Sequence, residues 1–175
     1  MADEIVIRKF EFNDAEQCAN LNALVWQDAY KHIFPMQVFE NQQKHINDKI
    51  KMFQNGIGNE NILTYVAEVE GEIVGYISGA LVSEYEYFAE KGYADMLAVY
   101  IKPQYQQKGI AKQFRQIFVG WLKENQKNKY VVGVLAQNNK ARLVYEKWGG
   151  ELSDYKQSFT MLGNDYSEVF YTYII

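Results

Sequence analysis

The sequence has little cysteine, little proline and no excess of positive charge. Its 175 residues include one cysteine and two prolines, and the formal net charge at pH 7 is −4. The one cysteine, Cys18, excludes an internal disulfide and is compatible with a cytoplasmic protein. The negative charge argues against a nucleic-acid partner, because proteins of that kind present a basic face. No apolar run approaches the roughly 20 residues of a transmembrane helix, so we expect no membrane partner.

The residues that are present have the composition of an ordinary globular protein. Apolar residues make up 48% and charged residues 23% of the chain, and its length favours one domain over residues 1–175. The start, Met1–Glu4, is acidic and lacks the pattern of a signal peptide, so we expect a cytoplasmic location. No group of His, Cys, Asp and Glu residues has the spacing of metal ligands, and we expect no metal.

The hydrophobic periodicity predicts an α/β protein (α+β, with a mixed sheet) whose elements follow the order β-α-α-β-β-β-α-β-α-β-β. A first strand is expected over Ile5–Phe10, and a helix that ends near Tyr30 follows it. Asn13 is the expected N-cap of that helix, with Glu16 completing a capping box. A second helix is expected over Met36–Gln54. The remaining strands are expected at 62–69, 72–82, 96–101, 130–136, 151–160 and 167–174, with helices from 109 and from 138 to 148.

One stretch of the chain joins a strand, a turn and a helix. Met96–Ile101 is an apolar run typical of a buried strand, Lys102–Lys108 is a polar turn, and a helical apolar face begins after Gly109. The first N–H groups of a helix lack intrahelical partners, and the helix dipole adds partial positive charge there. Lys108 and Lys112 add full charges, so this stretch predicts a site for a phosphate or diphosphate. It lacks the ending of a Walker loop and the glycine pattern of a dinucleotide fingerprint.

Two blocks of sequence carry a family resemblance. The first is Gln106–Ala111 (Gln-Gln-Lys-Gly-Ile-Ala), and the second is Asn138–Ala141 followed by Tyr145–Gly149 (Tyr-Glu-Lys-Trp-Gly). In these blocks and in the order of its elements, the sequence resembles the GNAT superfamily of N-acetyltransferases. The resemblance implies a central mixed sheet with helices on both faces. Two positions depart from the family pattern, Trp148 in place of a commoner Leu and Gly150 in place of an aromatic residue, and both bear on the shape of the acceptor pocket.

The resemblance implies acetyl-CoA as co-substrate. The cofactor-binding residues in this loop would be Gln106, Gln107, Lys108, Gly109, Ile110, Ala111 and Lys112, and the resemblance implies that backbone N–H groups of Gln107 through Ala111 hold the diphosphate. It implies that Val99, Tyr100 and Ile101 form a strand end that pairs with the pantetheine arm, where this strand splays from strand 130–136. An N–H group near Val99 would polarise the thioester carbonyl. Asn138 is either an N-cap or a hydrogen-bond partner of the arm, and the two roles are compatible.

The same resemblance makes Tyr145 the general acid that protonates the leaving thiolate. Asp95 stands before the central strand, where family members often carry an acidic residue, and is the candidate general base, directly or through water. Asp95 is alternatively a solvated loop carboxylate, and Glu84 and Glu86 are rival bases. Cys18 lies on a helical apolar stripe and is interpreted as a core residue, which favours direct transfer over an acyl-enzyme.

The acceptor remains the least specified part. Aromatic and acidic residues could line a pocket for a cationic amine, and the substrate-binding candidates are Trp26, Tyr30, Phe34 and Glu84. We therefore predict an N-acetyltransferase that moves the acetyl group of acetyl-CoA to a primary amine of a small molecule or peptide, as a monomer or a homodimer. The alternatives are a non-catalytic acyl-CoA-binding regulatory module on the same fold and a toxin that acetylates aminoacyl-tRNA. The negative charge speaks against the toxin.

Overall fold

The structure is a computed structural model, and it describes residues 4–175. Its strands are β1 (Val6–Lys9), β2 (Ile62–Val69), β3 (Glu72–Ala80), β4 (Ala94–Ile101), β5 (Lys129–Leu135), β6 (Glu151–Met161) and β7 (Asn164–Ile174). Its α-helices are α1 (Ala15–Tyr30), α2 (Met36–Lys44), α3 (Ile46–Asn55), α4 (Glu86–Ala89), α5 (Ile110–Glu124) and α6 (Asn139–Lys147). Residues 1–3, part of the acidic start that lacks a signal-peptide pattern, lie outside the described residues.

The described strands form a seven-stranded mixed sheet with the order β1-β2-β3-β4-β5-β7-β6. This confirms the predicted α/β class. The chain divides into two compact units. The first unit runs up to Gly79 and includes Ala98–Gly120, and the second comprises Ala80–Leu97 and Trp121–Ile175. The single domain over residues 1–175 stays a prediction. No described helix combines the length and apolarity needed to span a bilayer.

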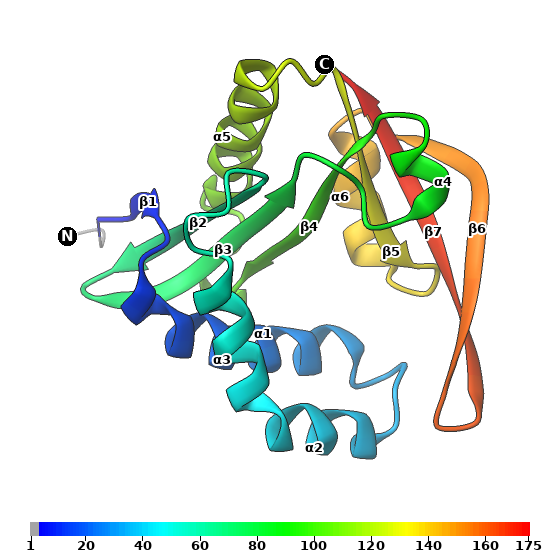
Figure 1. Cartoon of the computed structure of the whole chain (residues 1–175). Helices are drawn as coiled ribbons and strands as arrows, with labels where there is room; N and C mark the ends of the chain where they lie inside the picture. The colour runs from blue at the N-terminus through cyan, green and yellow to red at the C-terminus, as the bar shows by residue number, and fades with distance from the viewer. Residues whose placement is uncertain (1–3) are drawn as a thin grey trace. The chain divides into compact units, whose positions relative to one another are not determined.

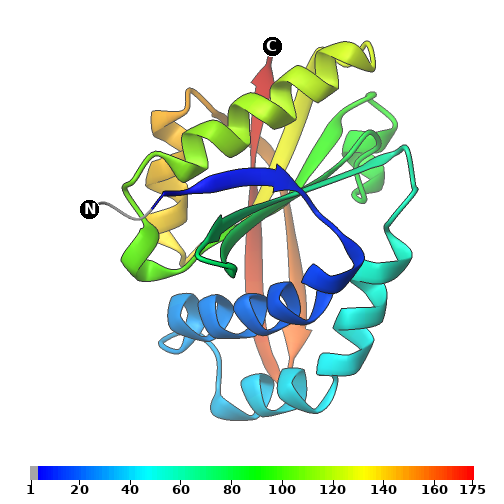
Figure 2. The ribbon, with the colours of Figure 1, turned by 90° about the vertical axis from the view of Figure 1, so that its left-hand side faces the viewer.

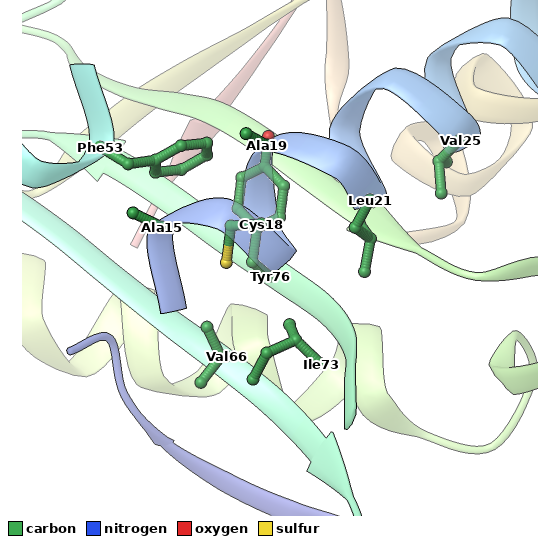
Figure 3. Close-up of a cluster of buried hydrophobic side chains, with 9 residues drawn as sticks. All are labelled: Ala15, Cys18, Ala19, Leu21, Val25, Phe53, Val66, Ile73 and Tyr76. Atoms are coloured by element: carbon green, nitrogen blue, oxygen red, sulfur yellow. The ribbon is translucent and has the colours of Figure 1, made fainter. Parts of the chain in front are cut away.

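In the first unit, α1 and α5 lie on opposite sides of the paired strands β1 and β2 (Figure 2). The apolar stripe of α1 faces the strands and α3, because helical spacing brings every third or fourth side chain to one face. Figure 3 shows the resulting cluster, whose buried members are Ala15, Cys18, Ala19, Leu21, Val25, Phe53, Val66, Ile73 and Tyr76. The core position expected for Cys18 is confirmed, since its side chain has no exposed area.

In the second unit, β7 pairs antiparallel with β5 along the whole of β5, from Lys129↔Ile174 to Leu135↔Glu168. β6 pairs with the other edge of β7, so the three strands lie side by side (Figure 1). β4 joins β5 in parallel through the pairs Ala94↔Tyr130 and Asp95↔Val131. Aromatic side chains cover one face of this part of the sheet, namely Tyr85, Phe88, Tyr93, Tyr155 and Phe170.

The helix predicted over 36–54 is wrong as one element, because the structure has α2 and α3 there. The break is at His45, whose backbone (φ −102°, ψ 18°) leaves the helical region. His45 N–H still bonds back to the Asn41 carbonyl at 3.2 Å, while the His45 carbonyl accepts from Asp48 N–H at 3.1 Å and starts α3. The sequence has neither Gly nor Pro at this point, so no local signal marks the break.

The start of α1 also differs from the prediction. Asp14, not Asn13, is the N-cap of α1, and the capping box of Glu11 and Asp14 belongs to a short 3-10 helix, Phe12–Asp14, that precedes it. The cause is Arg8, whose guanidinium binds Asp14 at 2.7 Å and Glu68 of β2 at 2.6 Å and so ties the strand–helix junction together. Such a bidentate guanidinium–carboxylate contact is geometrically specific.

Candidate active site

The first part of the site is the loop 106–112, which lies between β4 and α5 in the first unit. Gln107 (φ 61°) and Gly109 (φ 85°) both adopt left-handed backbone conformations. A Cβ at Gly109 would meet no heavy atom within 4 Å, so this backbone faces open space. Consecutive residues that alternate between right- and left-handed conformations turn their N–H groups toward one side and make an anion-binding concavity.

The amides at the start of α5 precede the first hydrogen bond of that helix. This bond runs from Gln113 N–H to the Gly109 carbonyl at 3.1 Å. The N–H groups of Ile110, Ala111 and Lys112 come before it, and among residues 4–175 no side chain or carbonyl caps them. Backbone N–H groups at a helix start, beside the open space at Gly109, fit a diphosphate.

The loop is held by its own residues. Gln106 Nε2 donates to the carbonyl of Ile101 at 3.0 Å, which closes the turn onto the end of β4. Lys108 Nζ lies 4.9 Å from the ring centroid of Tyr105 and remains exposed. Ile110 is buried and anchors the start of α5 in the core. The charged and backbone groups of the loop therefore face solvent while its apolar residue fixes their position.

The end of β4 packs against β3. Lys102 N–H donates to the Val74 carbonyl at 2.9 Å, and the Lys102 ammonium pairs with Glu72. Gly75 of β3 allows the close approach, because a Cβ there would lie 3.1 Å from the Tyr100 carbonyl oxygen. This contact fixes the strand end assigned to the pantetheine arm, Val99–Ile101, on its β3 side. The expected splaying of this strand end from β5 stays a prediction.

Three of the four predicted acceptor residues come together in the first unit. Trp26 stacks on Phe34 (centroids 5.0 Å apart, rings 12° from parallel) and lies 4.9 Å from Tyr30. Phe39 of α2 closes the group at 5.6 Å from Trp26. Phe34 and Phe39 are buried, so Trp26 and Tyr30 form the accessible side of this aromatic group. The fourth residue, Glu84, belongs to the second unit and is exposed there.

In the second unit, Asp95 is not a solvated loop carboxylate. It is the second residue of β4, and only 1% of its surface is exposed. Its Oδ2 atom accepts from the Ser83 hydroxyl at 2.8 Å and from the Glu84 N–H at 3.2 Å. Burial raises the pKa of Asp95 to about 7, and the negative charge of Glu84 adds to this. A carboxyl with this pKa exchanges its proton near neutral pH, as a general base requires.

A second carboxylate, which the sequence did not single out, lies in the same unit. Glu168 of β7 accepts from the Tyr85 hydroxyl at 2.9 Å and from Gln157 Nε2 at 2.8 Å. Gly133 of β5 leaves the room for this pair, since a Cβ there would lie 2.7 Å from Glu168 Oε1. No local pattern marks Glu168, because Gln157 is brought to it by the pairing of β6 with β7 and Tyr85 by the connection between β3 and β4.

Tyr145 lies on α6, and Asn138 directly precedes this helix, also in the second unit. Asn138 Oδ1 accepts from the Ala141 N–H at 3.1 Å, which confirms its role as an N-cap. The ring of Tyr145 is half-buried and flanked by Trp148 and Tyr171, with centroids 5.9 Å and 6.0 Å away. The contacts with these two rings restrict the position of the Tyr145 side chain.

The backbone of Tyr145 is fixed by β7. The Tyr173 hydroxyl donates to the Tyr145 carbonyl at 2.8 Å, and Gly150 N–H donates to the same oxygen at 3.0 Å. A Cβ at Gly150 would lie 2.6 Å from the Tyr173 hydroxyl. Gly150, the departure from the family pattern, therefore makes room for the tyrosine that holds Tyr145.

A family model for the Acetyltransferase (GNAT) family matches residues 24–150, which is well over half of the chain. The matched range contains the loop 106–112 as well as Asp95 and Tyr145. The protein belongs to this family of acetyltransferases. Comparison with curated proteins finds no match.

Solved structures of acetyltransferases share the fold. The PaiA N-acetyltransferase of Thermoplasma acidophilum, in complex with coenzyme A, is 21% identical, with 94% of this chain and 98% of that chain covered and a TM-score of 0.73. YncA of Salmonella typhimurium, with acetyl-CoA, is 15% identical (97% and 93% covered, TM-score 0.66). NAA60 of Arabidopsis thaliana, with a bisubstrate analogue, is 16% identical (98% of each chain covered, TM-score 0.66).

Proposed function

We propose that this protein is an acetyl-CoA-dependent N-acetyltransferase that acts on a primary amine of a small molecule or peptide. The observation that carries the proposal is the row of uncapped N–H groups at the start of α5, next to open space at Gly109. Membership of the family supports the reaction class, and related folds are known with coenzyme A or acetyl-CoA.

In this proposal the loop 106–112 binds the diphosphate of acetyl-CoA through its backbone amides, with Lys108 and Lys112 adding positive charge. The main chain of Val99–Ile101 pairs with the pantetheine arm, and Asn138 adds a hydrogen bond to it. Acetyl-CoA supplies the activated acetyl group as a thioester. Holding it beside the acceptor contributes to the rate through orientation.

Two side chains of the second unit handle protons. Asp95 takes a proton from the acceptor ammonium, and the free amine attacks the thioester carbonyl. As the carbon–sulfur bond breaks, the phenol of Tyr145 donates its proton to the leaving sulfur and regains one from solvent. The pKa of Asp95, about 7, supports its part, since a more basic carboxylate removes a proton more readily.

For the acceptor, we propose a cationic amine. Trp26 and Tyr30 offer the accessible side of a packed aromatic group, and ring faces attract ammonium groups. Phe34 supports them from behind, and Glu84 adds an exposed negative charge. The cytoplasmic location and the possible homodimer stay predictions.

A screen of amines that detects the free thiol of coenzyme A tests the proposal. The purified chain is mixed with acetyl-CoA and, in turn, with polyamines, amino acids, amine antibiotics and peptides with free N-termini. We expect thiol release that depends on one class of amine. Tight acetyl-CoA binding without thiol release above the uncatalysed rate for any amine would instead favour the non-catalytic acyl-CoA-binding module.

A further inference from the structure

Glu168 is held from two sides by neutral donors. The Tyr85 hydroxyl donates to Oε1 at 2.9 Å, and Gln157 Nε2 donates to Oε2 at 2.8 Å. Neither donor is a cationic side chain, and Glu168 itself is half-buried. Burial and the nearby Glu168 raise the pKa of Tyr85 above its ordinary value, so its phenol stays protonated and remains a donor.

The contact between Tyr85 and Glu168 is built over a glycine. A Cβ at Gly133 would lie 2.7 Å from Glu168 Oε1 and 2.8 Å from the Tyr85 hydroxyl. The ring of Tyr85 also packs edge-on against Phe170, with centroids 4.6 Å apart. Any other residue at 133 would push these two side chains apart, so the sequence of β5 makes space for their hydrogen bond.

The backbone of Tyr85 connects this contact to Asp95. Tyr85 N–H donates to Ser83 Oγ at 3.2 Å, and the Ser83 hydroxyl donates to Asp95 Oδ2 at 2.8 Å. The N–H of Glu84, between them, donates to the same carboxylate oxygen at 3.2 Å. The turn Ser83–Tyr85 therefore presents two donors to Asp95, while the side chain of Tyr85 fastens that turn to β7.

We infer that Glu168 and Tyr85 are positioning residues for Asp95: Glu168 anchors the Tyr85 hydroxyl, and the anchored turn holds both donors on the Asp95 carboxylate. The catalytic meaning of this arrangement rests on the proposed role of Asp95 as the base. Glu168 acts on Asp95 in a second way, through its charge. The titratable groups whose charges interact with Asp95 are Glu84 and Tyr85 of the connection and Glu168 of β7, and its partner on β5 is the apolar residue Val131.

The anchoring of the turn and the charge of Glu168 have opposite effects on the pKa of Asp95, and substitutions can separate them. In Glu168→Gln the side-chain oxygen still accepts from Tyr85, but the charge is gone, so we expect the pKa of Asp95 to fall. In Tyr85→Phe the charge of Glu168 remains, but the hydrogen bond that holds the turn Ser83–Tyr85 to β7 is lost. The donors of this turn then stabilise the ionised form of Asp95 less well, so we expect the pKa of Asp95 to rise. Ser83→Ala removes one donor directly and should shift the pKa in the same direction as Tyr85→Phe.

The measurement is a pH titration of the Asp95 side-chain carboxyl carbon by NMR in the intact 175-residue chain. We expect shifts of about 0.5 unit or more, downward in Glu168→Gln and upward in Tyr85→Phe. Glu90→Gln, an exposed carboxylate at the end of α4, is the control and should leave the titration of Asp95 unchanged. The acid limb of kcat/KM against pH should move in the same directions as the carboxyl titration.

Unchanged titration of Asp95 in both variants overturns the inference, and so does a shift in the same direction in both, which would indicate a general loosening. Failure of the proposed base is read from a different variant. If Asp95→Asn keeps the turnover of the wild type, Asp95 is not the base. The carboxyl titration still reports whether Glu168 and Tyr85 position it.

Discussion

The hydroxyl of Tyr173 donates a hydrogen bond to the backbone carbonyl of Tyr145 at 2.8 Å. The contact joins β7 to the helix that carries the proposed general acid, and it is possible only because residue 150 has no side chain. Gly150, one of the two departures from the family pattern, thus leaves the space in which Tyr173 holds the backbone of Tyr145.

Gly150→Ala should therefore disturb both stability and turnover. The added methyl would lie 2.6 Å from the Tyr173 hydroxyl and 3.0 Å from the Tyr145 carbonyl, and overpacking of this kind costs about 1–3 kcal/mol. We expect a lower melting temperature and a lower kcat. Gly120→Ala is the control, because a Cβ there meets nothing within 4 Å and alanine favours the helix by about 1 kcal/mol. An unchanged melting temperature in Gly150→Ala would contradict the packing described here.

Tyr145→Phe tests the general acid. Phenylalanine keeps the ring contacts with Trp148 and Tyr171 but lacks the proton. We expect kcat to fall by roughly 10²-fold, within the usual range for the loss of a general acid, with unchanged affinity for acetyl-CoA. Steady-state kinetics and calorimetry measure the two quantities. Tyr166→Phe on the β6–β7 hairpin is the matched control, and wild-type kcat in Tyr145→Phe would remove this residue from the mechanism.

The buried Asp95 should make stability fall as the pH rises. Its folded pKa, about 7, lies above the ordinary value of 3.8, so the folded state holds the proton more tightly than the unfolded state. Between these two values the free energy of unfolding decreases with pH. The gap, at about 1.4 kcal/mol per unit, corresponds to roughly 4 kcal/mol.

Urea unfolding of the wild type and Asp95→Asn at pH 4 to 8 checks this. We expect the free energy of unfolding of Asp95→Asn to depend less on pH between 4 and 7. The stability of the variant relative to the wild type should therefore increase as the pH rises. Parallel pH profiles for the two proteins would show that ionisation of Asp95 does not lower the free energy of unfolding, and would contradict the prediction.

Modification and substitution of Cys18 test whether the acetyl group is transferred directly to the acceptor. Burial raises the pKa of its thiol to about 12, with a smaller effect of the Asp14 charge, and none of its surface is exposed. We expect no reaction with iodoacetamide in the native protein, and an unchanged kcat in Cys18→Ala despite a loss of about 1 kcal/mol in stability. Loss of turnover in a folded Cys18→Ala variant would argue for an acyl-enzyme.

The sequence predicted what depends on local pattern. The strand, polar turn and helix around Gly109 follow from hydrophobic spacing, and the cap at Asn138 follows from residue type. It did not predict the break at His45, which has no glycine or proline, nor the N-cap at Asp14, which Arg8 and Glu68 hold from outside the helix.

The parts of the site that were missed depend on long-range pairing. Glu168 gains its role from Tyr85, 83 residues earlier in the chain, and the burial of Asp95, though not its candidacy as the base, was missed because its partner Ser83 lies 12 residues away. Tyr173 meets Tyr145 only when α6 lies against β7. Composition and periodicity carry no information about such pairs, since each partner alone is an ordinary residue of a strand or loop.

The most direct test of acetyl-CoA binding is calorimetric titration of this molecule into the wild type and Gly109→Glu. The central claim is that backbone amides beside Gly109 hold a diphosphate, so a carboxylate placed there should lower the affinity at least about tenfold through charge repulsion and occupied space. Gly58→Glu is the matched control, because Gly58 also has a positive φ (80°) and an open Cβ position. We predict binding by the wild type and Gly58→Glu and weakened binding by Gly109→Glu. Equal affinity in all three proteins would contradict the claim.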